Sequence, residues 1–337
     1  MEPHFAPDLR SAGAAPCRRR NPSRSRRSLC AAAALVAAAA AASAAPPVVA
    51  PGPAAGKLAF ERDGSVWVAS LDGSGAVRLA EGVDPAISPD GRSVAYTKDT
   101  SGPKGVRRHI AIVDVATRAS RGLASVPSDN SFGPVWSPDG SGLLVYVLAD
   151  KVWNLGLVKA DDSAFRLVVT GGPRVFPCWS AAWASDGKSI FCQDLANIAR
   201  IALDGKPLWS ASAAQLFPGG GLNSGSGISP SPDGGKLLVE VDMDEPVFVN
   251  SWDGPPPAVF LVDVAGRTAM RLTEKGTLAW QPEWLDTAAF LCVVQRQGET
   301  EPSLARVPLA GGAPTLLTRN ARNPTVSRPA AAPAASR

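Results

Sequence analysis

The 337-residue sequence contains few of the residues on which metal sites and nucleophilic enzyme sites usually depend. It has two histidines, His4 and His109, and no Gly-x-Ser-x-Gly nucleophile elbow. Two histidines cannot supply a clustered-histidine metal site, and a Ser-His-Asp arrangement would have to be built around His109. We interpret His109 as an ordinary residue at the start of a strand. The sequence therefore predicts no catalytic residue, no metal and no cofactor, and it favours a protein that is not an enzyme.

The sequence also lacks an excess of basic residues outside its N-terminal region. The formal net charge is +4, but residues 1–44 hold seven arginines against only Glu2 and Asp8. The remainder carries 27 basic and 28 acidic side chains. A domain that binds nucleic acid needs a basic surface, so we expect no nucleic-acid partner.

No long run of large hydrophobic residues is present. The arginine-rich N-terminus is followed by an uncharged, alanine-rich run from Leu29 to Ala42, which is too short and too weakly hydrophobic for a membrane span. Ala42-Ser43-Ala44 fits the small-x-small cleavage pattern. We predict that residues 1–44 are a signal peptide, that the mature chain begins near Ala45 without a membrane span, and that it is periplasmic or extracellular. The route stays open between Sec and twin-arginine export, because Ser25 to Leu29 resembles the start of a twin-arginine signal.

Cysteine is scarce in the predicted mature chain, which keeps only Cys178, Cys192 and Cys292. Three cysteines are too few for a disulfide scaffold, so the hydrophobic core must hold the fold. Cys178 and Cys192 flank one turn and could form a bridge across a hairpin. We favour the alternative, in which they are free buried thiols.

The most informative feature that is present is a repeated turn, seen at Pro134-Val135-Trp136-Ser137-Pro138-Asp139-Gly140. Proline presets φ at the first corner, aspartate can hydrogen-bond to its own backbone, and glycine tolerates the left-handed conformation that closes the turn. We interpret these aspartates as structural, and the tryptophan that precedes some turns as an interblade packing residue. Related segments are Asp84–Gly91, Ala182–Gly187, Ile228–Gly234 and Gln281–Asp286, whose turn aspartates lie 47 to 53 residues apart. Periods of this size are typical of propellers and repeat arrays.

Each repeat reads as four short strands, which we call A to D, with the turn between A and B. The chain opens at a B strand, Lys57 to Arg62, and Asn323 to Ser327 matches the missing A strand. We predict an all-β, six-bladed β-propeller of four-stranded blades over residues 57–327, closed by a C-terminal strand that completes blade one. Residues 45–56 are predicted to be a Pro/Ala linker, and residues 328–337 a disordered tail.

The Ser-Pro-Asp-Gly turns at this spacing resemble those of TolB-type propellers, also called WD40-like PD40 repeats, over about Lys57 to Ser327. The resemblance implies a periplasmic propeller, which in the TolB family binds the peptidoglycan-associated lipoprotein. TolB propellers follow an N-terminal α/β domain, and we expect this chain to lack it. Similar propellers also precede the catalytic domain of prolyl-oligopeptidase-type hydrolases.

Two functions remain open on this basis. The first is an exported, non-enzymatic binding or scaffold protein, expected to be monomeric, that presents one propeller face to a protein or cell-envelope partner. The alternative is a propeller enzyme or carbohydrate-binding protein, lactonase-like or lyase-like, with a site at the channel mouth. Inner strands offer only Asp84 and Glu283 as carboxylates for such a site.

The irregular loops predict which face binds. The B-to-C and D-to-A loops share one face of a propeller, which we call the loop face, and function concentrates on such loops. Blade two places basic residues there and blade five places acidic ones, while aromatic residues could anchor a partner. The predicted partner-binding residues are Lys104, Arg107, Arg108, Phe176, Asp242, Asp244 and Trp252.

Overall fold

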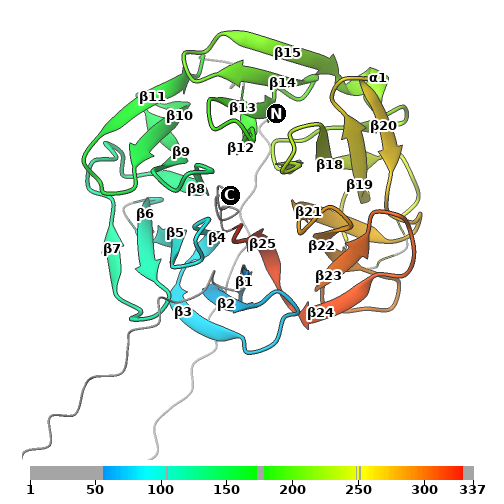
Figure 1. Cartoon of the computed structure of the whole chain (residues 1–337), viewed down its shortest axis with the longest axis horizontal. Helices are drawn as coiled ribbons and strands as arrows, with labels where there is room; N and C mark the ends of the chain where they lie inside the picture. Colours follow the sequence, from blue (N-terminus) through cyan, green and yellow to red (C-terminus); the bar gives the residue numbers. More distant parts are fainter. Residues whose placement is uncertain (1–55, 104, 173–177, 248, 250–251, 329–337) are drawn as a thin grey trace, which may run out of the picture. The chain divides into compact units, whose positions relative to one another are not determined.

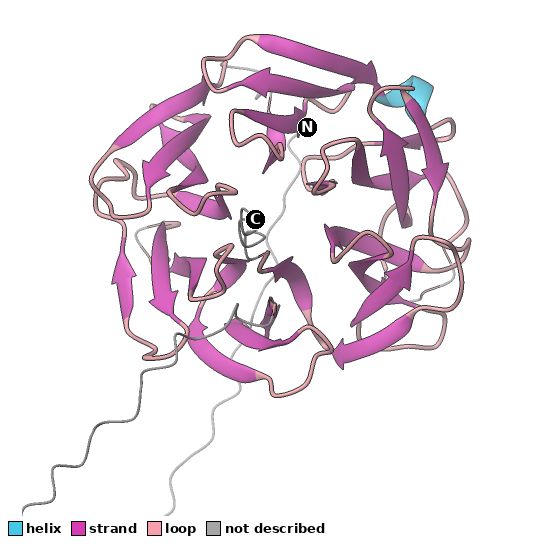
Figure 2. Ribbon diagram, viewed as in Figure 1, coloured by secondary structure: helices cyan, strands magenta, loops and turns pink. Residues whose placement is uncertain are grey.

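The computed structural model describes residues 56–103, 105–172, 178–247, 249 and 252–328. The predicted signal peptide, almost all of the linker, and residues 329–337 of the predicted tail lie outside the described residues, as do Lys104 and Phe176. Within the described part, the chain forms six sheets arranged as blades around a central axis (Figure 1). Strands make up nearly all of its regular structure, with one short helix, α1 (Ala213–Leu216), which the sequence did not predict (Figure 2).

The first three blades each contain four strands, ordered from the axis outward. Blade one has β25 (Arg322–Val326), β1 (Lys57–Arg62), β2 (Ser65–Ser70) and β3 (Val77–Glu81). Blade two has β4 (Val83–Ile87), β5 (Ser93–Asp99), β6 (Arg108–Asp114) and β7 (Ser120–Gly122). Blade three has β8 (Ser131–Trp136), β9 (Gly142–Ala149), β10 (Val152–Lys159) and β11 (Phe165–Thr170).

The remaining blades repeat this order. Blade four has β12 (Trp179–Trp183), β13 (Ser189–Gln193), β14 (Asn197–Ala202) and β15 (Pro207–Ser212). Blade five has β17 (Ile228–Pro230), β18 (Lys236–Met243), β19 (Pro257–Asp263) and β20 (Thr268–Arg271), and the short β16 (Gly220–Gly221) also pairs with β18. Blade six has β21 (Leu278–Trp284), β22 (Ala289–Gln295), β23 (Ser303–Pro308) and β24 (Thr315–Arg319).

The ring is closed by its two ends, as predicted. β25 pairs antiparallel with β1, with Leu58 opposite Val326 (Figure 1). The Lys57 amide donates to the Ser327 hydroxyl at 2.7 Å, and the Ser327 amide donates to the Lys57 carbonyl at 2.9 Å. The C-terminal strand therefore supplies the innermost strand of blade one, which confirms the predicted six-bladed fold.

The hydrophobic core lies between successive blades. One cluster joins Ala95 and Ile110 of blade two to Leu143 and Val145 of blade three, and all four side chains are buried. Tryptophans add hydrogen bonds across these interfaces: each indole N–H donates to a carbonyl of the preceding blade. The pairs are Trp136 with Ala86 at 2.9 Å, Trp183 with Val135 at 3.1 Å and Trp284 with Ser229 at 2.8 Å. The predicted packing role of this position is confirmed.

The turn aspartates are structural, as predicted. Asp139 accepts hydrogen bonds from the Ser137 hydroxyl at 2.6 Å and from the Ser141 amide at 3.0 Å. These bonds hold the pKa of Asp139 below its usual value, the Ser137 bond most strongly. Gly140 closes the turn with a φ of 72°, in the left-handed region that favours glycine. We call the face formed by these turns the turn face.

Most innermost strands contain a β-bulge near their start, where one residue has positive φ. These residues are Asp84, Gly133, Ser180, Gln281 and Asn323. The bulge exposes a backbone N–H toward the preceding blade, and a polar side chain there accepts it. The donor–acceptor pairs are Asp84 with Glu61 (3.4 Å), Gly133 with Thr97 (3.1 Å), Ala181 with Tyr146 (2.7 Å), Gln281 with Glu240 (2.9 Å) and Asn323 with Gln281 (2.8 Å).

The structure corrects one prediction, because Cys178 and Cys192 form a disulfide. Trp179 stands opposite Gln193 in the pairing of β12 with β13, so the two cysteines lie beside each other with their Cα atoms 5.0 Å apart. That separation lies within the range that a disulfide spans. Cys292 is a free, buried thiol. In the part of the chain that the structure describes, no helix is both long and apolar enough to cross a membrane.

Candidate functional site

The basic side of the predicted loop-face site lies at the start of β6. The Arg107 side chain is 51% exposed, and its Nη2 lies 3.9 Å from Asp129 Oδ2. Arg108 is more constrained: its guanidinium lies 4.3 Å from the centre of the Phe132 ring, and its Nε donates to Asn130 Oδ1 at 2.8 Å. Burial lowers the pKa of Arg108. Arg107 is therefore available to a partner, whereas Arg108 mainly joins blade two to blade three.

The acidic side lies at the end of β18. Asp242 accepts a hydrogen bond from the Asn223 side-chain amide at 2.7 Å, and Asp244 is exposed. The Trp252 ring is half-buried with its centre 5.4 Å from that of Trp280, and its indole N–H donates to the Pro255 carbonyl at 3.0 Å. Trp252 thus has a fixed position on its loop.

The two charged groups are brought to opposite blades rather than to one another, because blades two and five face each other across the ring (Figure 1). The contrast in charge is smaller than the sequence suggests. Asp129 lies beside Arg107, and Asp84 and Asp99 favour the charged form of Arg108. Lys104 and Phe176, the other two predicted residues, are outside the described residues.

A second candidate lies at the turn-face mouth of the central channel, which the loop-length argument missed. This pocket has a volume of about 390 Å³ and is lined by innermost strands of several blades. Apolar side chains from blades two to four form one wall, among them Ala86, Ile87 and Val135. Ser229, Glu283, Thr325 and Arg328 form the other. The repeat alignment carried a signal for it, since Glu283 is one of the two inner-strand carboxylates.

An ion pair dominates the polar wall. Glu283 Oε1 lies 2.8 Å from Arg328 Nη2, and Glu283 Oε2 accepts a hydrogen bond from the Ser229 hydroxyl at 2.8 Å. Burial raises the pKa of the Glu283 carboxyl, although Arg328 and Ser229 both favour its charged form. Arg328 also donates to the Trp284 carbonyl at 2.7 Å. The mouth therefore offers a charged pair against an apolar wall, an arrangement suited to binding an amphipathic group.

The other inner-strand carboxylate, Asp84, is partly buried. Its Oδ2 accepts a hydrogen bond from the Thr97 hydroxyl at 3.0 Å. Burial raises its pKa, and the nearby Glu61 adds to this effect. Thr97 belongs to the same blade and accepts the Gly133 amide of blade three at 3.1 Å, while the Asp84 amide donates to Glu61 of blade one at 3.4 Å. Asp84 is thus part of the hydrogen bonding that joins blades one to three. Among the described residues, no group of three or more His, Cys, Asp or Glu side chains is placed to hold a metal ion.

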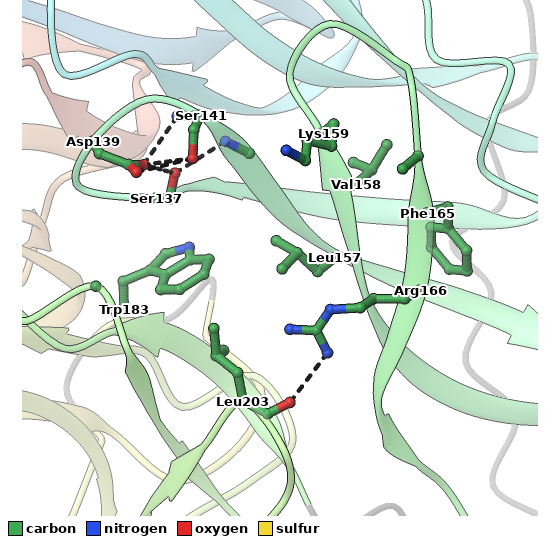
Figure 3. Close-up of a pocket in the computed structure, with 13 residues that line it drawn as sticks. Ser137, Asp139, Ser141, Leu157, Val158, Lys159, Phe165, Arg166, Trp183 and Leu203 are labelled. Carbon is green, nitrogen blue, oxygen red and sulfur yellow. Dashed lines mark hydrogen bonds between the residues drawn. The ribbon is translucent and has the colours of Figure 1, made fainter.

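A third pocket, of about 250 Å³, lies between blades three and four (Figure 3). Leu157, Phe165, Trp183 and Leu203 supply apolar lining, and Lys159 and Arg166 supply two cationic groups. Asp139 stands at one end, bonded to Ser137 and Ser141 of its own turn (Figure 3).

Comparison with known proteins confirms the fold. No family model matches the chain. Among curated proteins it is similar to the Protein TolB homolog of Chlorobaculum tepidum, 29% identical over 115 residues, which cover 32% of this chain and 24% of the relative. It is also similar to the Uncharacterized peptidase YuxL of Bacillus subtilis, 32% identical over 189 residues, which cover 54% of this chain and 25% of the relative. The chain thus spans about a quarter of the length of these curated relatives.

Solved structures place the chain among TolB-type propellers by fold. TolB from Acinetobacter baumannii superposes with a TM-score of 0.58 at 17% identity, covering 82% of this chain and 68% of that one. A putative TolB from Agrobacterium tumefaciens superposes with a TM-score of 0.57 at 13% identity, covering 78% of this chain and 88% of that one. A puromycin hydrolase superposes with a TM-score of 0.52 at 18% identity, covering 80% of this chain and 44% of that one. At these identities the likeness concerns the fold alone.

Proposed function

We propose that this chain, a six-bladed propeller of the TolB type, is an exported, non-enzymatic binding protein that presents its loop face to a protein partner of the cell envelope. The contrast between the two faces carries the proposal. On the turn face, Ser and Asp side chains bond to each other in repeated short turns, as at Asp90, Asp139 and Asp233. On the loop face, the links differ in length and expose charged side chains such as Arg107 and Asp244.

The partner would meet Arg107 and Asp244 first, since their charges are exposed on opposite sides of the ring. Exposed charges at an interface mainly raise the association rate and select partners. Trp252 would add a rigid aromatic contact, because its ring is already packed on Trp280. Lys104, Arg108, Phe176 and Asp242 complete the proposed surface.

Location and organisation belong to the same proposal. Residues 1–44 would be removed on export, residues 45–56 would act as a linker to the propeller of residues 57–327, and residues 328–337 would form the tail. We place the mature protein, as a monomer, in the periplasm or outside the cell. The likeness to the TolB proteins supports this location, as does the N-terminal pattern of arginines followed by small residues.

The test is capture of a partner from envelope extract by the mature chain, followed by affinity measurement with variants. Arg107→Glu combined with Asp244→Lys, and separately Trp252→Ala, should weaken binding at least about tenfold, or roughly 1.4 kcal/mol. The matched control is Lys188→Glu combined with Lys206→Glu, two exposed charges on the turn face. Thermal unfolding must first show that all variants are folded. If the loop-face variants bind the partner as tightly as the wild type while the Lys188→Glu, Lys206→Glu control binds more weakly, the interface lies on the turn face and the proposal is wrong.

A second candidate function is binding or turnover of a small ligand at the channel mouth, and the pocket with the Glu283–Arg328 pair favours it. The likeness to a puromycin hydrolase concerns the propeller fold alone and leaves this alternative open. Screening sugar polymers and lactones, with and without added metal, tests it. If the channel is the site, Glu283→Gln should abolish the response while Arg107→Glu leaves it intact.

A further inference from the structure

We propose that the pocket between blades three and four is a binding site for a small amphipathic carboxylate, that is, a compact organic acid with an apolar body. Its apolar lining is rigid. Trp183 is only 8% exposed, and its indole N–H is held by the Val135 carbonyl. Leu157 and Leu203 face the same space from neighbouring blades (Figure 3). At about 250 Å³, the pocket has room for one or two rings.

Neither cation of this pocket forms an ion pair among the described residues. Hydrogen bonds from Ser163, whose amide donates at 3.0 Å, lower the pKa of the neighbouring Asp161 carboxyl, and Lys159 lowers it further. The Arg166 guanidinium reaches into the space beside Leu157 and spends one N–H on the Leu203 carbonyl at 3.2 Å (Figure 3). Lys159 Nζ lies above Leu157 in the same view, and no hydrogen bond is drawn to it from the residues that line the pocket. Asp139, the nearby carboxylate, is already bonded to its own turn. The cations therefore keep donors for an anion from outside.

Comparison with the other blades shows that Lys159 departs from the repeat. It pairs with the first residue of the neighbouring strand, Gly142. The same position in blades two and five is aspartate, Asp114 and Asp263, and each accepts a backbone N–H of the following turn. Blades one, four and six have Ser70, Ala202 and Pro308 there. Blade three is therefore the one blade of the six with a cation at this position, and Lys159 adds a positive charge to the pocket.

Gly142 adds an independent observation. A Cβ there would lie 2.9 Å from the Val158 carbonyl oxygen and 3.3 Å from Leu157 Cδ1. Blades two, four and six have Ser93, Ser189 and Ala289 at this position. The missing side chain thus lets the Lys159 strand and the Leu157 side chain approach closely, which shapes this part of the pocket.

A monovalent carboxylate fits these features better than a phosphate does. A guanidinium and an ammonium group can share the two oxygens of one carboxylate, and Arg suits a planar, bidentate anion. The apolar lining needs a hydrophobic body to exclude water, which inorganic phosphate lacks. The site lies away from the loop face and does not depend on a partner there.

Isothermal titration of the mature chain with naphthoate, and with the neutral naphthamide as its matched probe, tests the proposal. Naphthoate should bind with a Kd below about 1 mM, and naphthamide should bind at least about tenfold more weakly. Lys159→Met and Arg166→Met should each weaken naphthoate at least about tenfold and leave naphthamide unchanged. Lys236→Met, an exposed lysine on the turn face of blade five, is the control and should bind as the wild type does.

A filling variant, Leu203→Trp, should abolish binding of both probes without changing any charge. The proposal is overturned if naphthamide binds as tightly as naphthoate. It is also overturned if folded Lys159→Met and Arg166→Met proteins bind like the wild type, or if no heat is released up to about 1 mM naphthoate. If inorganic phosphate binds to the pocket as tightly as naphthoate, the ligand needs no apolar body and the proposed ligand class is wrong.

Discussion

Stability should fall as pH rises through neutrality, because the buried Glu240 carboxyl is easier to protonate in the folded chain than in the unfolded one. Glu240 is 8% exposed and accepts N–H groups from Gln281 at 2.9 Å and Gly227 at 3.4 Å. Burial raises its pKa from an ordinary 4.5 to about 7, and the two hydrogen bonds oppose only part of that rise. The carboxylate form is therefore the costly one.

The direction and size of the effect follow from this difference. A raised folded pKa gives stability that is fully present below pH 4.5 and is lost as pH rises through about 7. At about 1.36 kcal/mol for each pH unit of pKa difference, the loss is roughly 3 kcal/mol. In Glu240→Gln the amide oxygen can still accept both N–H groups but cannot ionise. The free energy of unfolding of the variant, relative to that of the wild type, should therefore increase between pH 5 and pH 8 by up to about 3 kcal/mol.

Urea unfolding of both proteins at pH 5, 6, 7 and 8 measures the gap in the free energy of unfolding. Burial also raises the pKa values of Asp84 and Glu283, but these residues are present in both proteins and cancel in the comparison. The control is Glu274→Gln, which removes one exposed carboxylate. A gap between Glu240→Gln and the wild type that stays constant across this range would refute the reasoning.

Three further predictions concern the ends and the cross-link of the fold. Deleting residues 321–337 removes β25 and leaves the edge of β1 unpaired, so the Tm should fall by roughly 10 °C and the chains should associate. Calorimetry and size-exclusion chromatography measure these two effects. A truncated chain with the Tm of the full chain would contradict the closure of the ring by β25. The bridge between Cys178 and Cys192 spans 14 residues, so reducing it, or replacing both cysteines by serine, should lower the free energy of unfolding by about 3 kcal/mol. Cys292→Ser in the oxidised protein is the control for the loss of a cysteine that forms no bridge. Mass spectrometry of exported protein should give a chain that starts near Ala45, and a mass that retains Leu29 to Ala42 would instead favour an anchor.

The fold could be predicted because its signals are local and repeated. Each Pro-Asp-Gly turn requires specific backbone angles, so several copies at one spacing define the strand that enters and the strand that leaves. The closure was also readable, since Asn323 to Ser327 matches Asp84 to Ser88 in residue type. Both segments indeed form innermost strands.

The environment of single side chains could not be read in this way. Arg108 looked available in the sequence, but its guanidinium packs on Phe132 and Trp153 of the next blade, 24 and 45 residues further along. Cys178 and Cys192 have a spacing that suits either a bridge or two thiols. The register of β12 with β13 decides between them, and register depends on the bulge between Trp179 and Ala182.

The bulges help to distinguish polar residues with a structural role from polar residues that could bind a ligand. Each bulge N–H needs an acceptor from the preceding blade, and residues such as Glu61, Thr97 and Glu240 supply it. Blade six has Val293 at that position, which cannot accept, and Gln281 supplies the bond to Asn323 instead. The carboxylates of Glu61 and Glu240 therefore have a structural explanation before any catalytic one. Lys159 and Arg166 accept no bulge N–H, and Arg166 uses only one of its N–H groups on a backbone carbonyl, that of Leu203. Their pocket is therefore the stronger place to look for a ligand.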